Sequence, residues 1–429
     1  MAGLVVLPAL AMAGLVPEAA HAWTALALAA VFASAIDALL GWPRIAALDA
    51  SAPPVLRVAK KRAAHFRVRL LHPARRPPVL RMALALPDSI HAEPAEHVLA
   101  LPDAPASLVD WNLTPSARGR FPVPFLHLEA SSPAGLWAWR RSIPLRSEVR
   151  AQPALGAALR ANAAFLSKAL SGQRLVRNIG KGREFEKLRD YVAGDPVDDI
   201  HWRATAKRGH PVTKVFKVER AQEVYVVLDH SRLSGRVLAP PEPLLEHFIE
   251  AALLLGAVAE RHGDLFGLAT FDSRVTGIVR ADNGHAHFNA CRERLVTLQH
   301  RAVTPDFDEL ASFLRTRLRR RALLLFLVNL DDPVASESFL RAIEVLRRQH
   351  LCVVVQPHAP DVEPLFSHGR VHNLDDIQRA MAGHLQWHGL RQLASVLHAR
   401  GVPMASAPPE SLASVLVTRY LDAKRRQSI

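Results

Sequence analysis

An apolar segment near the N-terminus constrains this chain more than any other feature of its sequence. Trp23 to Trp42 is apolar except for Asp37 and has the ~20 residues that a helix needs to cross a bilayer. A first apolar segment, Ala2 to Val16, is shorter and is interrupted by Pro8. No Lys or Arg occurs before Arg44. The second segment therefore predicts a membrane anchor.

The first apolar segment has two interpretations. In one, residues 1–43 form a transmembrane helical hairpin with PEAAHA as its outer turn. In the other, residues 1–16 are the apolar region of a signal peptide that is cleaved at Ala20-His21-Ala22. We favour the hairpin, because the second segment anchors the chain in either case. The positive-inside rule then places the soluble domains in the cytoplasm, since basic residues follow the anchor closely: Arg44, Arg57, Lys60, Lys61, Arg62, Arg67 and Arg69.

The formal net charge of +14 comes mostly from Arg spread along the chain. A nucleic-acid-binding protein would instead show a clustered stripe with interleaved aromatic residues or a known motif, so no nucleic-acid partner is expected. The densest basic run, Arg315 to Arg321, precedes an apolar strand and is interpreted as the solvated end of a helix. Cys291 and Cys352 form neither a disulfide framework nor a zinc-site spacing.

Two regions follow the anchor. Residues 50–150 contain short runs of alternating polarity that are separated by Pro, Gly and Ser, which predicts a small β-sandwich. These runs are HFRVRLL, VLRMALAL, FPVPFLHLEA and LWAWRRSIPL. Residues 151–222 are predicted to form a helical connector followed by a polar segment.

From Glu223 the pattern changes to apolar strands that alternate with helices. The strands around VYVVL, LFGLATF, ALLLFLVNL and LCVVVQ are apolar throughout, as in strands that helices cover on both faces. Residues 223–429 are therefore predicted to be a doubly wound α/β domain with a mostly parallel sheet. The FDSRVTG turn indicates one antiparallel edge strand.

Polar residues follow three of these strands. Asp229 and Ser231 lie in LDHSR, Asp272 in TFDS, and Asp331 in NLDDP. The carboxyl ends of parallel strands meet at one edge of a sheet, where ligands bind in open α/β folds. Oxygen ligands of this kind suit Mg²⁺. The alternative is that these residues cap the helices that follow the strands.

Gly182 to Asp229 contains GREF, LRDY, GDPVDDIHW and VYVVLDHS. This combination resembles the signature of the bacterial family called domain of unknown function 58. AIDALLGW, ARGRFPV, SSPAGLW and TRYLDAKRR extend the resemblance to most of the chain. Members are anchored in the membrane, carry a von Willebrand factor A-like (Rossmann-like) domain and are typically encoded beside MoxR-type AAA+ ATPases. The resemblance thus implies a multi-pass protein of the bacterial inner membrane with such an ATPase as partner.

The resemblance also implies a metal-ion-dependent adhesion site with the pattern Asp-x-Ser-x-Ser. Asp229 and Ser231 match its first two positions, and Asp331 is the best match to its later Asp. Leu233 stands at the third hydroxyl position, with Ser234 displaced by one residue. The pattern is therefore degenerate, and Mg²⁺ is a possible rather than a required cofactor.

The polar stretch Gly182 to Gly209 allows two compatible interpretations. Its ions pair with one another and clamp neighbouring domains, or its charged and aromatic residues form a docking surface for a protein partner. Ile200 and Trp202 alternate with polar residues, which predicts a half-buried strand. The partner-binding candidates are Glu184, Arg189, Tyr191, Gly194, Asp195, Trp202 and Lys207.

Enzyme motifs are absent from the sequence: it has no Gly-x-Ser-x-Gly, no His-Glu-x-x-His and no phosphate-binding loop. We therefore expect a non-enzymatic, membrane-anchored adaptor or scaffold that works with a MoxR-type AAA+ ATPase in the assembly of protein or metalloprotein complexes. The alternative is a receptor that binds its ligand through a metal ion at Asp229.

Overall fold

The computed structural model describes residues 11, 20–72, 79–102, 104–153, 184–193, 195–217, 222–238, 240–365, 367 and 373–426. It divides into two compact units, Met1–Ala154 and Leu155–Ile429. The first apolar segment of the hairpin predicted for residues 1–43 lies outside the described residues apart from residue 11, as does most of the helical connector predicted after residue 151.

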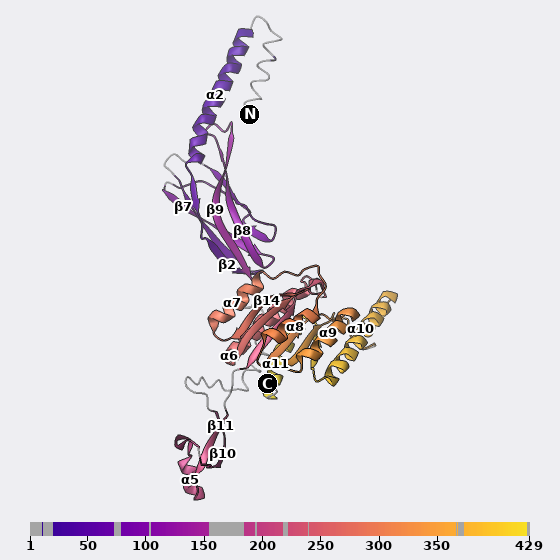
Figure 1. The fold of residues 1–429 in the computed structure, drawn as a ribbon. Coiled ribbons are helices and arrows are strands. Elements are labelled where there is room, and N and C mark those ends of the chain that lie inside the picture. The colour runs from indigo at the N-terminus through magenta and orange to yellow at the C-terminus, as the bar shows by residue number, and fades with distance from the viewer. Residues whose placement is uncertain are drawn as a thin grey trace. The chain divides into compact units, whose positions relative to one another are not determined.

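The first unit begins with one long apolar helix, α2 (Ala20–Ala46), visible in Figure 1. At 1.5 Å per residue it is about 40 Å long, and its part His21–Ala46 is long and apolar enough to cross a membrane. Large apolar side chains along it are exposed: Leu26, Leu28, Val31, Phe32, Ile36, Leu39, Leu40 and Trp42. This composition agrees with the membrane association predicted from the sequence.

Two sheets follow the helix. One has the order β1-β3-β7-β5 and the other β2-β9-β8-β4-β6, with all neighbours antiparallel except β2 and β9. Alternate side chains of the strands face a shared core that contains Phe66, Leu80 and Trp111. The strands are β1 (Asp49–Ser51), β2 (Val55–Ala59), β3 (Ala64–Leu71), β4 (Leu80–Leu84), β5 (Ile90–Glu93), β6 (Glu96–Leu99), β7 (Ala106–Pro115), β8 (Gly119–Ser131) and β9 (Ala138–Gln152).

Asp37 fastens α2 to the turn between β8 and β9. Its carboxylate accepts hydrogen bonds from the Ser132 hydroxyl and from the backbone N–H groups of Ala134 and Leu136. Asp37 is buried, although most of the helix around it is exposed. A buried carboxylate needs such donors, because an unpaired one would lose its hydration without compensation. The acidic residue in the apolar helix is therefore a structural contact within this unit.

Further contacts hold the same end of the helix. The Trp137 indole N–H lies 3.0 Å from both the carbonyl oxygen and the hydroxyl of Ser34. The Arg141 guanidinium donates to the carbonyl oxygens of Ile45, Ala46 and Leu48, just where α2 ends. A cation at these carbonyls satisfies groups that have no partner within the helix and complements the helix dipole.

Replacing Asp37→Asn should loosen this contact, because the amide nitrogen of Asn puts a donor opposite the N–H groups of the turn. We expect faster amide hydrogen exchange in residues 131–137 of the full chain in detergent, with the rest of the sandwich little changed. Asp49→Asn, at an exposed carboxylate of the same unit, is the control. Equal exchange in both variants would show that Asp37 does not hold the turn.

The second unit is built on a six-stranded sheet with the order β14-β13-β12-β15-β16-β17. All neighbouring strands are parallel except β13 and β14. This is the doubly wound order, in which the chain adds strands on one side of β12 and then, from β15 onward, on the other side. The strands are β12 (Glu223–Asp229), β13 (Leu265–Phe271), β14 (Val275–Asp282), β15 (Leu323–Leu327), β16 (Leu351–Pro357) and β17 (Met404–Ala407).

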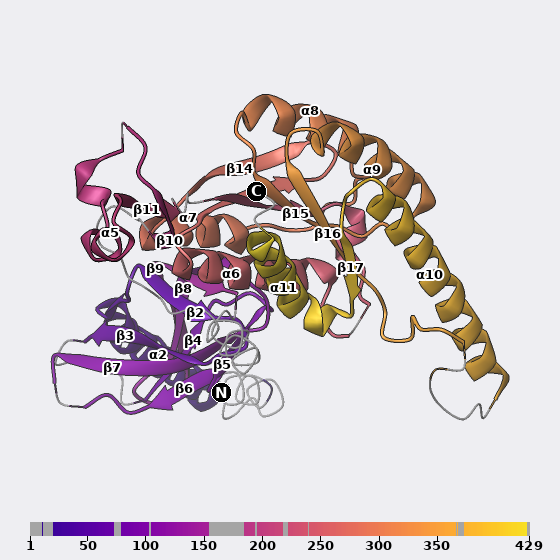
Figure 2. The ribbon, with the colours of Figure 1, turned by 90° about the horizontal axis from the view of Figure 1, so that it is seen from below.

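Helices cover both faces of the sheet, as Figure 2 shows. Side chains of α6, α7 and α11 pack on one face, and side chains of α8, α9 and α10 pack on the other. The α/β fold predicted from the apolar strands is confirmed, including the antiparallel edge strand. The helices are α6 (Leu244–Arg261), α7 (His285–Val296), α8 (Phe307–Arg317), α9 (Pro333–Leu346), α10 (Leu374–Ala399) and α11 (Leu412–Arg425).

The polar signature segment forms a small hairpin motif. Strands β10 (Glu184–Asp190) and β11 (Val212–Lys217) pair antiparallel, and the 3₁₀ turn η2 (Val197–Asp199) and helix α5 (Trp202–Arg208) lie between them. The strand predicted at Ile200 to Trp202 is wrong, because Trp202 begins α5. The ring nitrogen Nδ1 of His201 accepts the N–H of Ala204 and caps the helix there, which alternation alone does not reveal.

Candidate functional site

The carboxyl edge of the large sheet gathers the predicted metal-site residues Asp229, Ser231 and Asp331. β12 ends at Asp229, and the 3₁₀ turn η3 (Arg232–Gly235) follows at once. Asp229 and Ser231 are fully buried. They are buried because η3 and the loop that ends at Val303 close over the strand end, where the N–H of Arg232 donates to the Val303 carbonyl.

Only one of the two oxygens of the buried Asp229 carboxylate accepts a hydrogen bond from the residues that the structure describes. Its Oδ1 accepts the N–H of Ser231 at 2.8 Å, while Oδ2 is buried without a hydrogen-bond partner among the described residues. The pKa of Asp229 is raised to about 6, chiefly by burial and to a smaller extent by the nearby Asp272 carboxylate, which together outweigh the hydrogen bonds from Ser231. An unpartnered oxygen of this kind suits either a proton or a cation.

The residue at the third position of the predicted adhesion pattern supplies no oxygen ligand. Leu233 is buried in the core cluster on one face of the sheet. The hydroxyl of Ser234 donates to the carbonyl oxygen of Ser231, and the Ser231 hydroxyl accepts the N–H of Leu233. These hydroxyls are therefore engaged in building the turn, which is the capping role that strand-end Ser residues often have.

Arginine side chains meet the acidic residues that follow β15. Arg232 donates to Asp332 at 3.0 Å, and Arg236 lies 3.7 Å from the Asp331 carboxylate. The side chain of Gln356 also donates to Asp331. An open depression of about 590 Å³ lies here, lined by Arg232, Leu233, Arg236, Asp331, Asp332 and Gln386.

The two carboxylates at this depression differ in environment. Burial raises the pKa of Asp331 above its ordinary range, and hydrogen bonding and the Arg236 charge only partly oppose this. Asp332 instead caps α9 through the N–H of Val334. Capping, which was the alternative to metal binding, is therefore observed at Asp332.

Asp272 is a further carboxylate at this edge, and both of its oxygens accept hydrogen bonds. It accepts the N–H of Arg274 at 3.1 Å and the Arg301 guanidinium at 3.0 Å. Burial alone would raise the pKa of Asp272, but the Arg274 hydrogen bond, His230 and Arg301 outweigh it and hold the pKa below its usual range. The His230 ring is occupied as well, because its nitrogens contact Thr276 and the Gln299 carbonyl.

The fit to Mg²⁺ is incomplete. Asp229 and Ser231 occupy the first two positions of the adhesion pattern, but Leu233 supplies no oxygen and Arg236 places a cation beside Asp331. Within the described ranges, no group of three His, Cys, Asp or Glu residues could hold a metal ion. These residues do not form the octahedral oxygen site that Mg²⁺ requires.

The partner-binding candidates lie in the hairpin motif. Arg189 pairs with Asp195 at 2.6 Å, and the Val192 N–H also donates to Asp195. These two contacts, the Val192 hydrogen bond first, hold the pKa of Asp195 below its usual range. Lys207 lies on α5, and the Tyr191 N–H donates to the Pro211 carbonyl. Gly194 and the side chain of Glu184 lie outside the described part of the chain.

The hairpin motif also exposes apolar side chains. Trp202 is 65% exposed, Val197 63% and Val192 58%. Sequence reasoning singled out Trp202 but not the two valines, which stand among polar residues and give no periodic signal. At the edge of the sheet it missed Arg236 and Gln386, because η3 and α10 bring them there from separate parts of the chain.

Comparison with known proteins confirms the family resemblance. Residues 187–385 match the family described as "Protein of unknown function DUF58". Uncharacterized proteins of Mycobacterium tuberculosis and Mycobacterium bovis are each 23% identical to the chain over 282 residues, which is 62% of this chain and 86% of the relative.

Solved structures also resemble the chain. An aerotolerance-related membrane protein from Bacteroides fragilis has a TM-score of 0.30 at 10% identity and covers 47% of this chain and 99% of its own. The SpRpn10 VWA domain has a TM-score of 0.28 at 12% identity and covers 47% of this chain and 95% of its own. The α/β fold class itself follows from the strand order and from the helices on both faces of the sheet.

The state of Asp229 predicts a pH-dependent stability. The folded state binds the proton more tightly than the unfolded state, since the pKa rises from 3.8 to about 6. Stability therefore falls as pH rises through this window, and the cost is complete above it. Replacing Asp229→Asn removes the titrating group and should gain about 2 kcal/mol relative to the original chain between pH 4.5 and 7.5.

Amide hydrogen exchange of β12 in the full chain measures this difference, with Asp282→Asn at an exposed carboxylate as the control. A pH-independent effect of Asp229→Asn would contradict the buried, unpaired state of Asp229. Slower exchange of the original chain with added MgCl₂, lost in Asp229→Asn, would instead show that Asp229 holds a cation.

Proposed function

We propose that this chain, whose residues 187–385 carry the domain of unknown function 58, is a membrane-anchored adaptor that binds a protein partner without catalysing a reaction. The partner that the family resemblance favours is a MoxR-type AAA+ ATPase, acting in the assembly of protein or metalloprotein complexes. The observation that carries the proposal is the hairpin motif of residues 184–217, which exposes Trp202 and contains an Arg189–Asp195 ion pair.

A small motif that combines an exposed Trp with paired charges has the composition of an interaction hot spot. Trp and Arg dominate the binding energy of protein interfaces, and charged neighbours add specificity. Trp202 stands at the first position of α5 with 65% of its surface exposed, so it contributes little to the packing of its own motif. Asp195 orders the turn before it through Val192 and Arg189. These contacts restrict the turn before a partner binds, which lowers the entropic cost of binding.

The anchor is α2. With basic residues such as Arg44 following it, the positive-inside rule orients the later domains to the cytoplasm of the bacterial inner membrane, where an ATPase has access to them. The multi-pass topology proposed with it includes the first apolar segment, Ala2 to Val16.

The thiols argue for binding rather than catalysis. Burial raises the pKa of Cys291 and that of Cys352 to about 12, so neither is a thiolate at neutral pH. Cys291 lies 3.6 Å from Nε2 of His287, but that nitrogen is also 2.7 Å from the Phe266 carbonyl. Nε2 must then carry the proton that it donates to the carbonyl, and it is no base for the thiol.

The test is binding of the detergent-solubilised full chain to the MoxR-type ATPase of its own host, followed by biolayer interferometry with ATP or ADP. Trp202→Ala should weaken binding by about tenfold or more, since hot-spot truncations cost about 2 kcal/mol. Asp195→Asn should weaken it as well by loosening the turn. Val334→Ala is the matched control, because Val334 is also exposed in the first turn of a helix.

The fold of each variant is checked by amide hydrogen exchange of residues 184–217, where Trp202→Ala should change little because surface substitutions act within about 0.5 kcal/mol. Unchanged ATPase binding in a folded Trp202→Ala variant would overturn the docking role of this motif. Failure of the original chain to bind the ATPase in either nucleotide state would overturn the proposed partner.

A further inference from the structure

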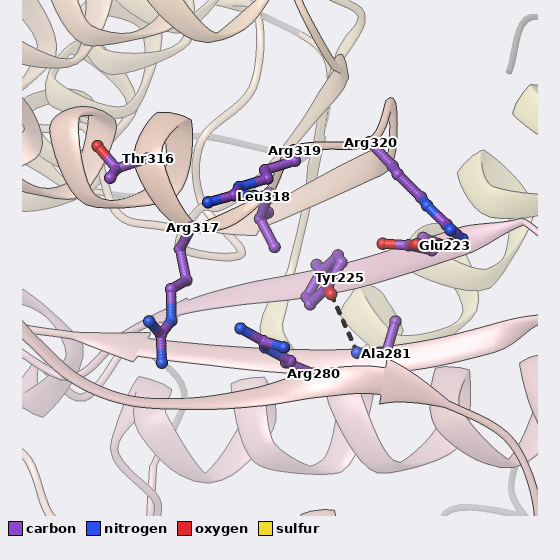
Figure 3. Close-up of a pocket in the computed structure, with 9 residues that line it drawn as sticks. All are labelled: Glu223, Tyr225, Arg280, Ala281, Thr316, Arg317, Leu318, Arg319 and Arg320. Carbon is purple, nitrogen blue, oxygen red and sulfur yellow. Dashed lines mark hydrogen bonds and ion pairs between the residues drawn. The ribbon is translucent and has the colours of Figure 1, made fainter.

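A second pocket lies at the opposite, amino edge of the large sheet. β12 begins there at Glu223, the antiparallel β14 ends there, and α8 ends there before β15 begins. These elements border an open pocket of about 410 Å³, a volume typical of a small-ligand site. Figure 3 shows the residues that line it, named here the arginine pocket: Glu223, Tyr225, Arg280, Ala281, Thr316, Arg317, Leu318, Arg319 and Arg320.

The charge of the arginine pocket is uneven. Four guanidinium groups face one carboxylate, Glu223, which lies 4.0 Å from Arg320. Among the described residues, the structure shows no ion pair for Arg280, Arg317 or Arg319. These guanidinium groups are exposed, so water screens their mutual repulsion, and a bound anion would offset what remains of it. The pocket therefore has the charge of a site for an anion with two or three negative charges.

The floor of the pocket is rigid and polar. Tyr225 is almost fully buried, and its hydroxyl oxygen accepts the N–H of Ala281 at 3.0 Å. Gly267 leaves room for this ring, since a Cβ there would lie 2.4 Å from it. Burial raises the pKa of Tyr225, so its hydroxyl keeps its proton. The floor thus stays uncharged beneath the arginines.

A purely structural role accounts for only part of the cluster. Arg317 lies in the last turn of α8, where a cation complements the helix dipole, as the interpretation of this run as a solvated helix end requires. Arg280 belongs to β14, a separate element that has no such dipole. In Figure 3, Arg280 and Arg317 extend from the two sides toward the space between them. The dipole does not explain why both sides contribute guanidinium groups.

We propose that the arginine pocket binds a small polyanion that carries a diphosphate or triphosphate group. Guanidinium groups pair with phosphate oxygens through two parallel hydrogen bonds, and three of them neutralise a group of this charge. The diphosphate or triphosphate belongs either to a soluble molecule or to a phosphorylated lipid headgroup. This site is separate from the proposed docking motif and stands whether or not the partner proposal holds.

The test measures binding of sodium pyrophosphate to the full chain in detergent by isothermal titration calorimetry, with sodium sulfate at equal ionic strength as the reference anion. Arg317→Gln/Arg319→Gln should weaken pyrophosphate binding by about tenfold or more, and so should Arg280→Gln. The control is Arg315→Gln/Arg348→Gln, which removes the same charge from exposed sites outside the pocket and should change binding by less than about twofold.

A second titration with dihexanoyl phosphatidic acid and with dihexanoyl lipid pyrophosphate distinguishes the source of the phosphate groups. Preference for the lipid pyrophosphate over free pyrophosphate assigns the pocket to a lipid headgroup, and the reverse assigns it to a soluble ligand. Equal weakening in the pocket and control variants would show adsorption to the net positive charge and overturn the proposal. So would binding of sulfate as tight as that of pyrophosphate, or no binding of any phosphate probe.

Discussion

The burial of β12 on both faces is the constraint on which the second unit depends. Val224, Val226 and Leu228 pack into the core on one face of the sheet, and Tyr225 and Val227 pack into the core on the other. A strand buried in this way must pair along its whole length, because its backbone groups have no access to water. It pairs with β13 and β15, and these pairings set the register of the central sheet.

Because both faces are covered, the binding capacity of the sheet is confined to its two edges. At the carboxyl edge, burial leaves Asp229 without a partner for Oδ2 while arginines approach Asp331 and Asp332 from outside. At the amino edge, Glu223 meets an excess of guanidinium groups. The two edges therefore differ in charge balance: carboxylates and arginines pair at the carboxyl edge, whereas guanidinium groups outnumber the carboxylate at the amino edge.

The strands of the large sheet were predictable because β12, β15 and β16 are apolar throughout, and few other structures bury such runs. The long α10 and the short β17 gave no comparable signal, since few side chains of α10 are buried and β17 is only four residues long. The alternation of polar and apolar residues predicted a strand at Trp202. The residue instead begins a helix, which the hydrogen bond from the Ala204 N–H to His201 caps. The partner of Asp37 was hidden in the same way, since 95 residues separate it from Ser132.

At the candidate site, the sequence predicted where the polar residues lie in the fold better than it predicted whether they bind a metal ion. Asp229 and Ser231 lie at the predicted edge, yet the adhesion pattern also requires a hydroxyl where Leu233 packs into the core. Once that position is apolar, the turn after β12 can be held by its own hydrogen bonds, and Ser234 and Ser231 supply them. These hydrogen bonds within the turn then supply the ordering energy that a bound cation would otherwise contribute. A chain with this arrangement keeps the doubly wound α/β sheet and holds the turn after β12 through its own hydrogen bonds.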